Sequence, residues 1–269
     1  MNTKVKVKLS PEQETLLITL YAKSQPDNPL FFDPSAQNIL NQVDYDFDKL
    51  NVPYKTIVLI CQRAKKFDNV TRRFLEDNPG GVVIQLGCGL DTRFDRVDDG
   101  RVDWYDLDMA PVIDLREQLF AGSERYHMIS TSVTELGWME KVAADGRHVL
   151  VIAEGLLMYI DEPDVRRLVL GLRDLFPGCQ LLADVFSKLT ARSAANHPSL
   201  KSTGATLGWG IDDPEDLKTW SPGIQLIEEW YFSDDPDLVK LNAFYRFAYH
   251  LAGAFMLVKR AHRIVHYQL

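Results

Sequence analysis

A short apolar strand that runs directly into a glycine turn is the feature that most constrains this fold. Residues 82–86 read Val-Val-Ile-Gln-Leu, and Gly87 and Gly89 follow at once on either side of Cys88. Glycine lets the backbone turn sharply and lets a ligand approach where a side chain would stand in the way. The pattern predicts a nucleotide-type cofactor at the end of this strand. A tight strand-to-helix turn without a ligand is the alternative that this stretch alone leaves open.

The position five residues after Gly87 discriminates between cofactors. A dinucleotide fingerprint spaced G-x-G-x-x-G needs glycine or alanine there, and this chain has Thr92. Threonine disfavours NAD, so a nicotinamide oxidoreductase is the weakest of our interpretations. A turn for S-adenosylmethionine accepts a ligand that carries no phosphate and has no such requirement.

Charge and composition exclude several classes of partner. The 269 residues carry a formal net charge of -8, which repels nucleic-acid backbones and anionic membranes, so we expect neither partner. No apolar run reaches membrane-spanning length and no signal-peptide pattern follows Met1, which predicts a cytoplasmic protein. The odd number and wide spacing of Cys61, Cys88 and Cys179 predict reduced thiols, and the histidines lack metal-ligand spacing, so we predict no metal.

The chain divides into a helical first part and an alternating second part. Helical periodicity in residues 9–78 predicts a helical cap, taken as residues 1–80 and integral to the domain, and Asp33 before Pro34 predicts a helix N-cap within it. Residues 81–269 form the predicted core. Short apolar runs there alternate with amphipathic stretches at 111–121 and 163–176, which is typical of crossover units in a parallel sheet. The predicted strands are residues 82–86, 102–107, 126–130, 148–153 and 180–185.

The end of the chain departs from this alternation. Residues 187–222 are rich in glycine and proline, which predicts an irregular lid insertion. Two further strands, at 224–232 and about 254–266, predict a terminal antiparallel hairpin, with a helix over 236–250 left open. The fold class is therefore α/β, with a mostly parallel sheet.

Polar residues at the strand ends are the candidate ligand contacts, because ligands of open parallel sheets bind beyond the carboxyl ends of the strands. Asp106 and Asp108 close the second strand, near the spacing at which an acid accepts hydrogen bonds from ribose hydroxyls. Glu154 lies at the mouth of a buried strand, where an ionised carboxylate needs a ligand amine or hydroxyl, or an internal salt bridge, as its partner. Ser132 and Val133 follow the third strand, where an adenine ring is expected, although ordinary loop residues would read the same.

Three motifs occur at residues 86–93 (LGCGLDTR), 105–108 (YDLD) and 153–159 (AEGLLMY). In their order and spacing they resemble the leucine carboxyl methyltransferase family, including its bacterial branch linked to polyketide methyl-ester formation. Residues 32–36 (FDPSA), and Arg63 followed by Phe67 and Asp68, are similar to its amino-terminal pattern, so the resemblance covers nearly the whole chain.

The resemblance implies a class I, Rossmann-like methyltransferase with a seven-stranded sheet and S-adenosylmethionine as methyl donor. It also implies transfer to an oxygen, often of a carboxylate. In the family a basic pair binds the methionine carboxylate, and the matching positions are Arg63 and, less securely aligned, Lys23. The chain departs from the family at Ser132, where many members have an acid near the adenine. It departs from the wider superfamily at Gln85, where an acid is common.

The predicted function is O-methylation of a carboxyl group on a small-molecule secondary metabolite. The sequence assigns no catalytic residue, because an ionised carboxylate needs no general base. Tyr159, Trp209 and Tyr21 are candidates for the acceptor pocket, with the core as their alternative location. Methylation of a protein carboxyl terminus and non-catalytic binding of S-adenosylmethionine remain open, and the oligomeric state stays undetermined.

Overall fold

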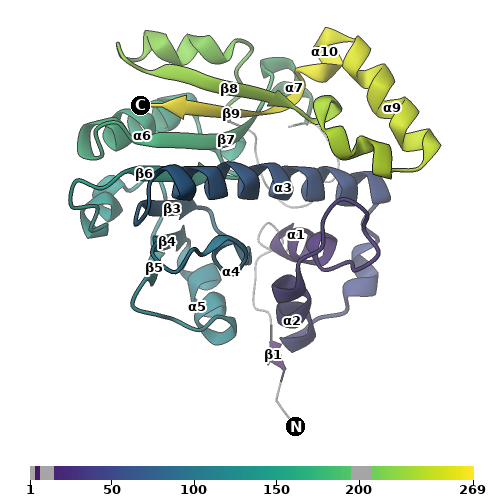
Figure 1. The fold of residues 1–269 in the computed structure, drawn as a ribbon, viewed down its shortest axis with the longest axis horizontal. Coiled ribbons are helices and arrows are strands. Elements are labelled where there is room, and N and C mark those ends of the chain that lie inside the picture. The colour runs from purple at the N-terminus through teal and green to yellow at the C-terminus, as the bar shows by residue number, and fades with distance from the viewer. Residues whose placement is uncertain (1–3, 7–14, 195–207) are drawn as a thin grey trace.

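A seven-stranded, mostly parallel sheet forms the middle layer of the structure (Figure 1). The computed structural model describes residues 4–6, 15–194 and 208–269. Across the sheet the strands are ordered β5-β4-β3-β6-β7-β9-β8, and β9 runs antiparallel to both of its neighbours. In chain order they are β3 (Val82–Leu86), β4 (Asp103–Asp108), β5 (Tyr126–Ser130), β6 (Val149–Ala153), β7 (Gln180–Phe186), β8 (Gln225–Tyr231) and β9 (His262–Gln268). The predicted α/β fold is confirmed.

Helices cover both faces of this sheet, which explains why its central strands are nearly continuous apolar runs. Ile84 and Leu86 of β3 belong to an apolar cluster that includes residues of α6 (Glu162–Leu175). Val83, one step along the strand, faces the other way into a cluster with α3 (Tyr54–Asp77) and α4 (Arg93–Val97). The crossover helices between parallel strands are α4, α5 (Ala110–Leu119) and α6, whereas α3 precedes the first strand of this sheet and covers the sheet from outside these units.

Strand β3 is the switch point of the sheet. Its neighbours are β4 on one side and β6 on the other, so the chain builds outward from β3 in both directions. Leu86, the last residue of β3, lies opposite Leu107 and Ala153, so the three strands end at about the same level. Connections that leave in opposite directions open a crevice beyond the carboxyl ends at this point, where the glycine turn lies.

The N-terminal helices pack directly on the core. They are α1 (Thr15–Lys23) and α2 (Pro34–Gln42), followed by the short helix η1 (Phe47–Leu50), and the two-residue strands β1 (Val5–Lys6) and β2 (Val43–Asp44) pair beside them. Asp33 accepts a hydrogen bond from the N–H of Ala36 at 3.1 Å and so caps α2, as predicted. Leu17 and Leu20 share one apolar cluster with Leu90 of the glycine turn. We therefore keep the cap, residues 1–80, as a proposed part of the same domain, although α3 within that range covers the sheet itself.

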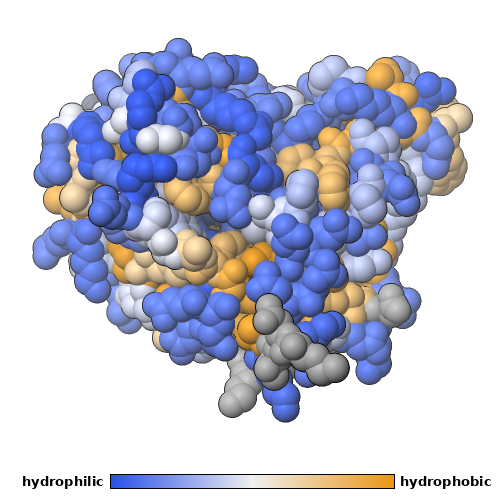
Figure 2. Space-filling model, turned by 60° about the horizontal axis from the view of Figure 1, so that its bottom comes forward, coloured by the Kyte–Doolittle hydropathy of each residue, from blue (hydrophilic) through white to orange (hydrophobic). Residues whose placement is uncertain are grey.

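The segment between β8 and β9 corrects one predicted strand. The strand expected from Ala254 begins at His262, because residues 243–259 are helical: α9 (Ala243–Ala254) and α10 (Met256–Lys259) follow η5 (Phe232–Asp234) and η6 (Pro236–Lys240). A short apolar run does not distinguish a strand from a helix. Large apolar side chains of α9 and α10 are exposed, with Phe244 73% and Leu257 81% exposed. These two helices lie at the upper right of Figure 1, and hydrophobic residues are visible at the surface of the same part of the molecule in Figure 2.

The described parts of the expected lid are more ordered than its composition predicts. Residues 187–194 include α7 (Lys188–Ala194), and residues 208–222 include η4 (Pro214–Thr219). Ile211 and Leu217 are buried in the main core, and the N–H of Ile211 donates to the carbonyl of Phe186 at 2.8 Å. The rest of the expected lid, residues 195–207, lies outside the described residues. Within the described ranges, no helix is both long and apolar enough to cross a bilayer.

Candidate functional site

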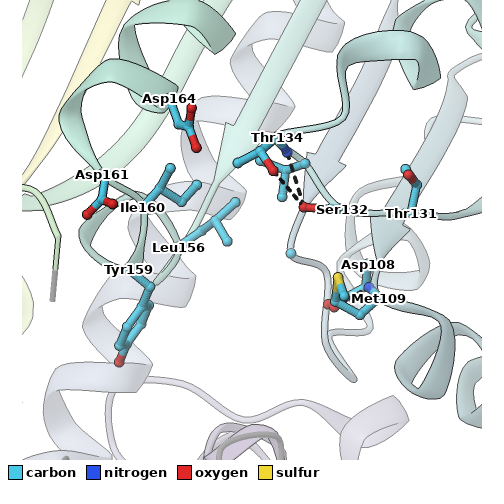
Figure 3. A pocket seen from close by; sticks show the side chains of 12 residues that line it. Asp108, Met109, Thr131, Ser132, Thr134, Leu156, Tyr159, Ile160, Asp161 and Asp164 are labelled. Carbon is cyan, nitrogen blue, oxygen red and sulfur yellow. Dashed lines mark hydrogen bonds between the residues drawn. The ribbon is translucent and has the colours of Figure 1, made fainter. Parts of the chain in front are cut away.

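Two adjoining pockets lie at the carboxyl edge of the sheet and share Gly87 and Tyr159. In the first pocket, Asp108 and Ser132 lie on one side and Leu156 and Tyr159 on the other (Figure 3). The first side comes from the ends of β4 and β5, and the second from the loop after β6. The remaining lining residues are Met109, Thr131, Val133, Thr134, Ile160, Asp161 and Asp164.

The second pocket lies between α1 and the ends of β3, β6 and β7. Its charged lining residues come from separate elements and are Lys23, Arg63, Asp91 and Glu154. Apolar and hydroxyl side chains complete the wall and include Thr15, Leu16, Thr19, Met158 and Phe186. The two pockets together make one continuous candidate site with a polar end and an end of mixed character.

The glycine turn between the pockets packs closely against leucine side chains, which a side chain on either glycine would displace. Gly87 and Gly89 have φ values of +61° and +52°, a left-handed conformation that favours glycine. A Cβ atom on Gly89 would lie 2.8 Å from Cδ2 of Leu16, and one on Gly87 would lie 2.9 Å from Cδ1 of Leu156. The N–H of Gly89 donates to Oδ2 of Asp108 at 2.8 Å. The sharp turn predicted from the two glycines is present, and it lies against Leu16 on one side and Leu156 on the other.

A buried arginine that the sequence did not single out holds this turn from behind. Nη1 of Arg116 donates to the carbonyl oxygens of Gly89 at 2.8 Å and Asp91 at 2.9 Å. Its Nη2 bonds the carboxylate of Asp106 and the hydroxyl of Tyr126. Arg116 thus fixes the glycine turn to β4 and β5 through one guanidinium.

The two acids at the end of β4 have different environments. Asp106 is 2% exposed, and its carboxylate also accepts a hydrogen bond from Nε1 of Trp104 at 2.8 Å. The hydrogen bonds of this carboxylate are therefore made to other groups of the protein. Asp108 lines the first pocket, and burial raises its pKa although the N–H groups of Gly89 and Met109 oppose this. The structure therefore favours Asp108 over Asp106 for a contact with a ligand.

A network of buried ion pairs surrounds the second pocket. Asp68 is fully buried and bonds Nε of Arg93 at 2.8 Å and Nε of Arg96 at 2.7 Å. Arg93 also pairs with Glu154, and Lys23 pairs with Asp91 at 2.8 Å. These contacts join α1 and α3 to the segment just after the glycine turn.

Arg63 belongs to the same network from the other side. Its Nε donates to Oε1 of Glu154, and its Nη1 to Oδ2 of Asp184, both at 2.9 Å. Lys23 and Arg63, predicted to bind one carboxylate, both line the second pocket while also paired with protein acids. The internal salt bridge considered for Glu154 is present, and Glu154 still lines the pocket.

Three of these acids, Asp68, Asp91 and Asp184, have pKa values below the usual range of an aspartate. Burial alone would raise the pKa of Asp68, but the charges of Arg96 and Arg93 outweigh it, and the pKa lies below its usual range. The same balance holds at Asp184, where Arg63 provides the main opposing charge and lowers the pKa. All three acids therefore remain ionised through the physiological range.

The lowered pKa values predict a loss of stability in acid. A carboxyl whose folded pKa is depressed contributes stability that is present above its unfolded pKa, about 3.9, and is lost as the pH falls through the folded value. We expect the free energy of unfolding to fall steeply below about pH 4. Urea unfolding between pH 7 and pH 3 measures this, and Asp68→Asn should show a shallower slope. A wild-type stability that stays constant down to pH 3 would contradict the expectation.

Comparison with known protein families identifies the family of this chain. The model of the family described as "Leucine carboxyl methyltransferase" matches residues 15–172, more than half of the chain. The chain belongs to the leucine carboxyl methyltransferase family. The match spans α1, Arg63, the glycine turn and Glu154, so the family pattern coincides with both pockets.

Two methyltransferases are similar to this chain in sequence. The chain is 34% identical over 97% of its length to the tetracenomycin polyketide synthesis O-methyltransferase TcmP of Streptomyces glaucescens, covering 98% of that protein. It is 31% identical to the S-adenosyl-L-methionine-dependent methyltransferase dpfgK of Gibberella zeae, with 86% of each covered.

The solved structures bear on the fold alone. A duf574 family protein from Streptomyces avermitilis has a TM-score of 0.59 at 11% identity, with 94% of this chain and 96% of that one covered. Magnesium protoporphyrin IX methyltransferase from Synechocystis, with bound S-adenosylhomocysteine, has a TM-score of 0.51 at 13% identity, with 94% and 99% covered.

As a member of the leucine carboxyl methyltransferase family, the chain is an S-adenosylmethionine-dependent methyltransferase. The cleft fits this cofactor. A Cβ on either glycine of the turn would displace a leucine that lines the cleft, and Oε1 of the buried Gln85, which lines the second pocket, has no hydrogen-bond partner among the described residues. Polar groups therefore face the cleft where a ligand with polar ends would lie.

The predicted site residues are brought together, with three exceptions among those considered. Lys23, Arg63, Gly87, Gly89, Asp108, Ser132, Val133 and Glu154 line the two pockets, whereas Asp106 lies behind them. Of the acceptor candidates, Tyr159 lines both pockets, Trp209 lies in the main core, and Tyr21 stacks on Phe47 without lining either pocket. In the described part of the chain, no cluster of three or more His, Cys, Asp or Glu side chains could hold a metal.

Proposed function

We propose that this methyltransferase forms a methyl ester on a carboxylate of a small-molecule acceptor. The family name and the O-methyltransferase TcmP of polyketide synthesis support an oxygen acceptor. The observation that carries the choice of a carboxylate is the match to a family described by a carboxyl acceptor, and no histidine among the described residues lines either pocket. A carboxylate is ionised at neutral pH and needs no base, whereas a phenol or an alcohol does.

Tyr159 fits this proposal as an orienting group. It is 46% exposed, lies where the two pockets meet, and burial raises the pKa of its phenol further than the nearby Arg63 charge lowers it. The phenol therefore stays protonated near neutral pH, where it can donate a hydrogen bond but cannot accept a proton as a base. The Tyr159 hydroxyl would then align an acceptor oxygen.

We assign the binding roles by pocket. The first pocket takes the adenosine, with the Asp108 carboxylate on the ribose hydroxyls and Ser132 and Val133 beside the adenine. The second takes the amino-acid end, with Arg63, supported by Lys23, on the carboxylate and Glu154 on the ammonium group. When bound, S-adenosylmethionine supplies an electrophilic methyl group, so the protein acts by alignment and by exclusion of water, effects that can contribute roughly 7–11 kcal/mol.

Calorimetric titration with S-adenosylhomocysteine tests this placement. We expect Arg63→Met and Glu154→Gln each to weaken binding by about 1.5–3 kcal/mol, the loss typical of a hydrogen bond to a charged group. Lys65→Met is the matched control, because Lys65 lies on the same helix but pairs with Asp235 away from both pockets. Unchanged affinity in both test variants would show that the amino-acid end of the cofactor lies elsewhere.

The identity of the product tests the acceptor. Small aromatic and polyketide-type carboxylic acids incubated with a donor labelled in its methyl group should yield a product that mild base hydrolyses to methanol. Methyl ethers and N-methyl groups survive that treatment, so a base-stable product would contradict the carboxylate assignment. Methylation of peptide carboxyl termini in the same assay would point instead to a protein substrate.

A further inference from the structure

Asp184 connects three elements behind the second pocket. It lies in β7 and is 0% exposed. Its Oδ1 accepts a hydrogen bond from the N–H of Gly155 at 2.5 Å, and its Oδ2 accepts from Nη1 of Arg63 at 2.9 Å. Nε2 of His262, on the adjacent strand β9, lies 2.7 Å from the same Oδ2. One carboxylate thus fixes the turn after β6, a side chain of α3 and the antiparallel strand.

These contacts leave Arg63 with one end of its guanidinium available. Nε is used by Glu154 and Nη1 by Asp184, whereas Nη2 donates no hydrogen bond to a described residue. Arg63 lines the second pocket, but Asp184 does not. A planar guanidinium held at two of its nitrogens has a fixed orientation, so the two acids determine where the third nitrogen lies.

The turn after β6 is fitted to the same guanidinium. Gly155 has a φ of +65°, and a Cβ built on it would lie 3.3 Å from both Nη1 and Nη2 of Arg63. Because Asp184 holds the N–H of Gly155 and Nη1 of Arg63 together, it sets the approach of the turn to the arginine. The backbone that carries Glu154, the second partner of Arg63, is positioned by the same contact.

We propose that Asp184 is a positioning residue for the methyl donor: it acts through Arg63, orienting Nη2 toward the donor's carboxylate without touching the donor. The proposal rests on the function proposed above, in which Arg63 binds that carboxylate. It separates Asp184 from Glu154, which lines the pocket and is assigned a direct contact. Asp184→Asn keeps Oδ1 as an acceptor for the N–H of Gly155 but loses the charge that holds Arg63, so it should weaken donor binding only while Arg63 is present.

A double-mutant cycle tests this dependence. Asp184→Asn should weaken S-adenosylhomocysteine binding roughly tenfold in the wild-type background, as expected for a lost hydrogen bond between charged groups. In the Arg63→Met background the same substitution should change the affinity by less than about twofold, because its target is gone. In turnover, Asp184→Asn should raise the KM for S-adenosylmethionine and leave kcat within about twofold.

The outcomes distinguish this inference from the function on which it rests. If Arg63→Met itself leaves affinity unchanged, the proposed placement of the donor is wrong. If Arg63→Met weakens binding but Asp184→Asn weakens it equally in both backgrounds, Asp184 does not act through Arg63 and the inference is overturned.

A control and a second variant guard against a general effect on folding. Asp235→Asn removes another buried carboxylate that bonds α3, through Nζ of Lys65 at 2.9 Å and Nε2 of Gln62 at 3.2 Å. It should lower the melting temperature without changing affinity. If Asp184→Asn does not fold, Arg63→Lys probes the same contact, because lysine keeps the charge but cannot bond both acids in a fixed plane. Wild-type affinity in Arg63→Lys would also overturn the proposal.

Discussion

Replacing Asp68 with alanine is expected to lower the free energy of unfolding by about 3–5 kcal/mol, because it leaves two guanidiniums without their shared carboxylate. Asp68 lies on α3 and is 0% exposed, and its two oxygens accept hydrogen bonds from Arg93 and Arg96 of α4. Arg93 is itself fully buried, so water cannot replace the lost partner. Unfolding by urea, followed by far-ultraviolet circular dichroism, measures the change.

A surface ion pair provides the comparison for Asp68→Ala. Asp46 pairs with Lys49 at 3.1 Å, with both side chains more than half exposed, so Asp46→Ala should cost less than about 1 kcal/mol. If the two alanine variants lose the same stability, burial does not determine the contribution of Asp68. The network would then be less important to the fold than its geometry indicates.

The second large effect is expected for Arg116→Met, which should weaken both the fold and the cofactor site. The change leaves the buried Asp106 carboxylate without its cation and removes the donor to the carbonyl oxygens of Gly89 and Asp91. Breaking a buried pair from one side costs about 3–5 kcal/mol of stability. Because the glycine turn loses its rear support, the affinity for S-adenosylhomocysteine should also fall, by roughly tenfold or more.

Measuring stability and affinity on the same samples separates the two roles of Arg116. Arg101→Met is the control, since Arg101 is 60% exposed, pairs only with Asp99 among the described ion pairs, and lies outside both pockets. Below the unfolding transition, a folded Arg116→Met variant with wild-type affinity would show that the turn keeps its conformation without this arginine. Arg116 would then serve the fold alone.

The strands and the glycine turn were predictable because their signals are local. Each of β3 to β7 lies within one residue of its predicted limits, and the φ values of Gly87 and Gly89 explain why glycine occurs there. Helix and strand could not be separated for residues 254–258, where an apolar run forms the exposed side of a helix. For these residues the sequence does not indicate whether the side chains are buried in the protein or exposed at its surface.

The charge network could not be predicted, because its partners are far apart in the chain. Lys23 and Asp91 are 68 residues apart, and Arg63 and Asp184 are 121 apart, so no spacing rule connects them. The sequence also could not assign Asp106 to Arg116 and Asp108 to the pocket, because both acids close the same strand and only the folded structure shows which of them is enclosed. The internal ion pairs of an arginine such as Arg63 become visible only once the strands place its neighbours.

The ion pairs that join the N-terminal helices to the glycine turn restrict how the site can open. Lys23 binds Asp91 across this boundary, and Asp33 binds Arg96, with all four side chains at most 9% exposed. An outward movement of α1 and α2 would leave these buried charges without partners, at a cost of several kcal/mol for each broken pair. We therefore expect S-adenosylhomocysteine to leave, and S-adenosylmethionine to enter, through an opening that is already present. The contact of α1 and α2 with the glycine turn should stay intact throughout turnover.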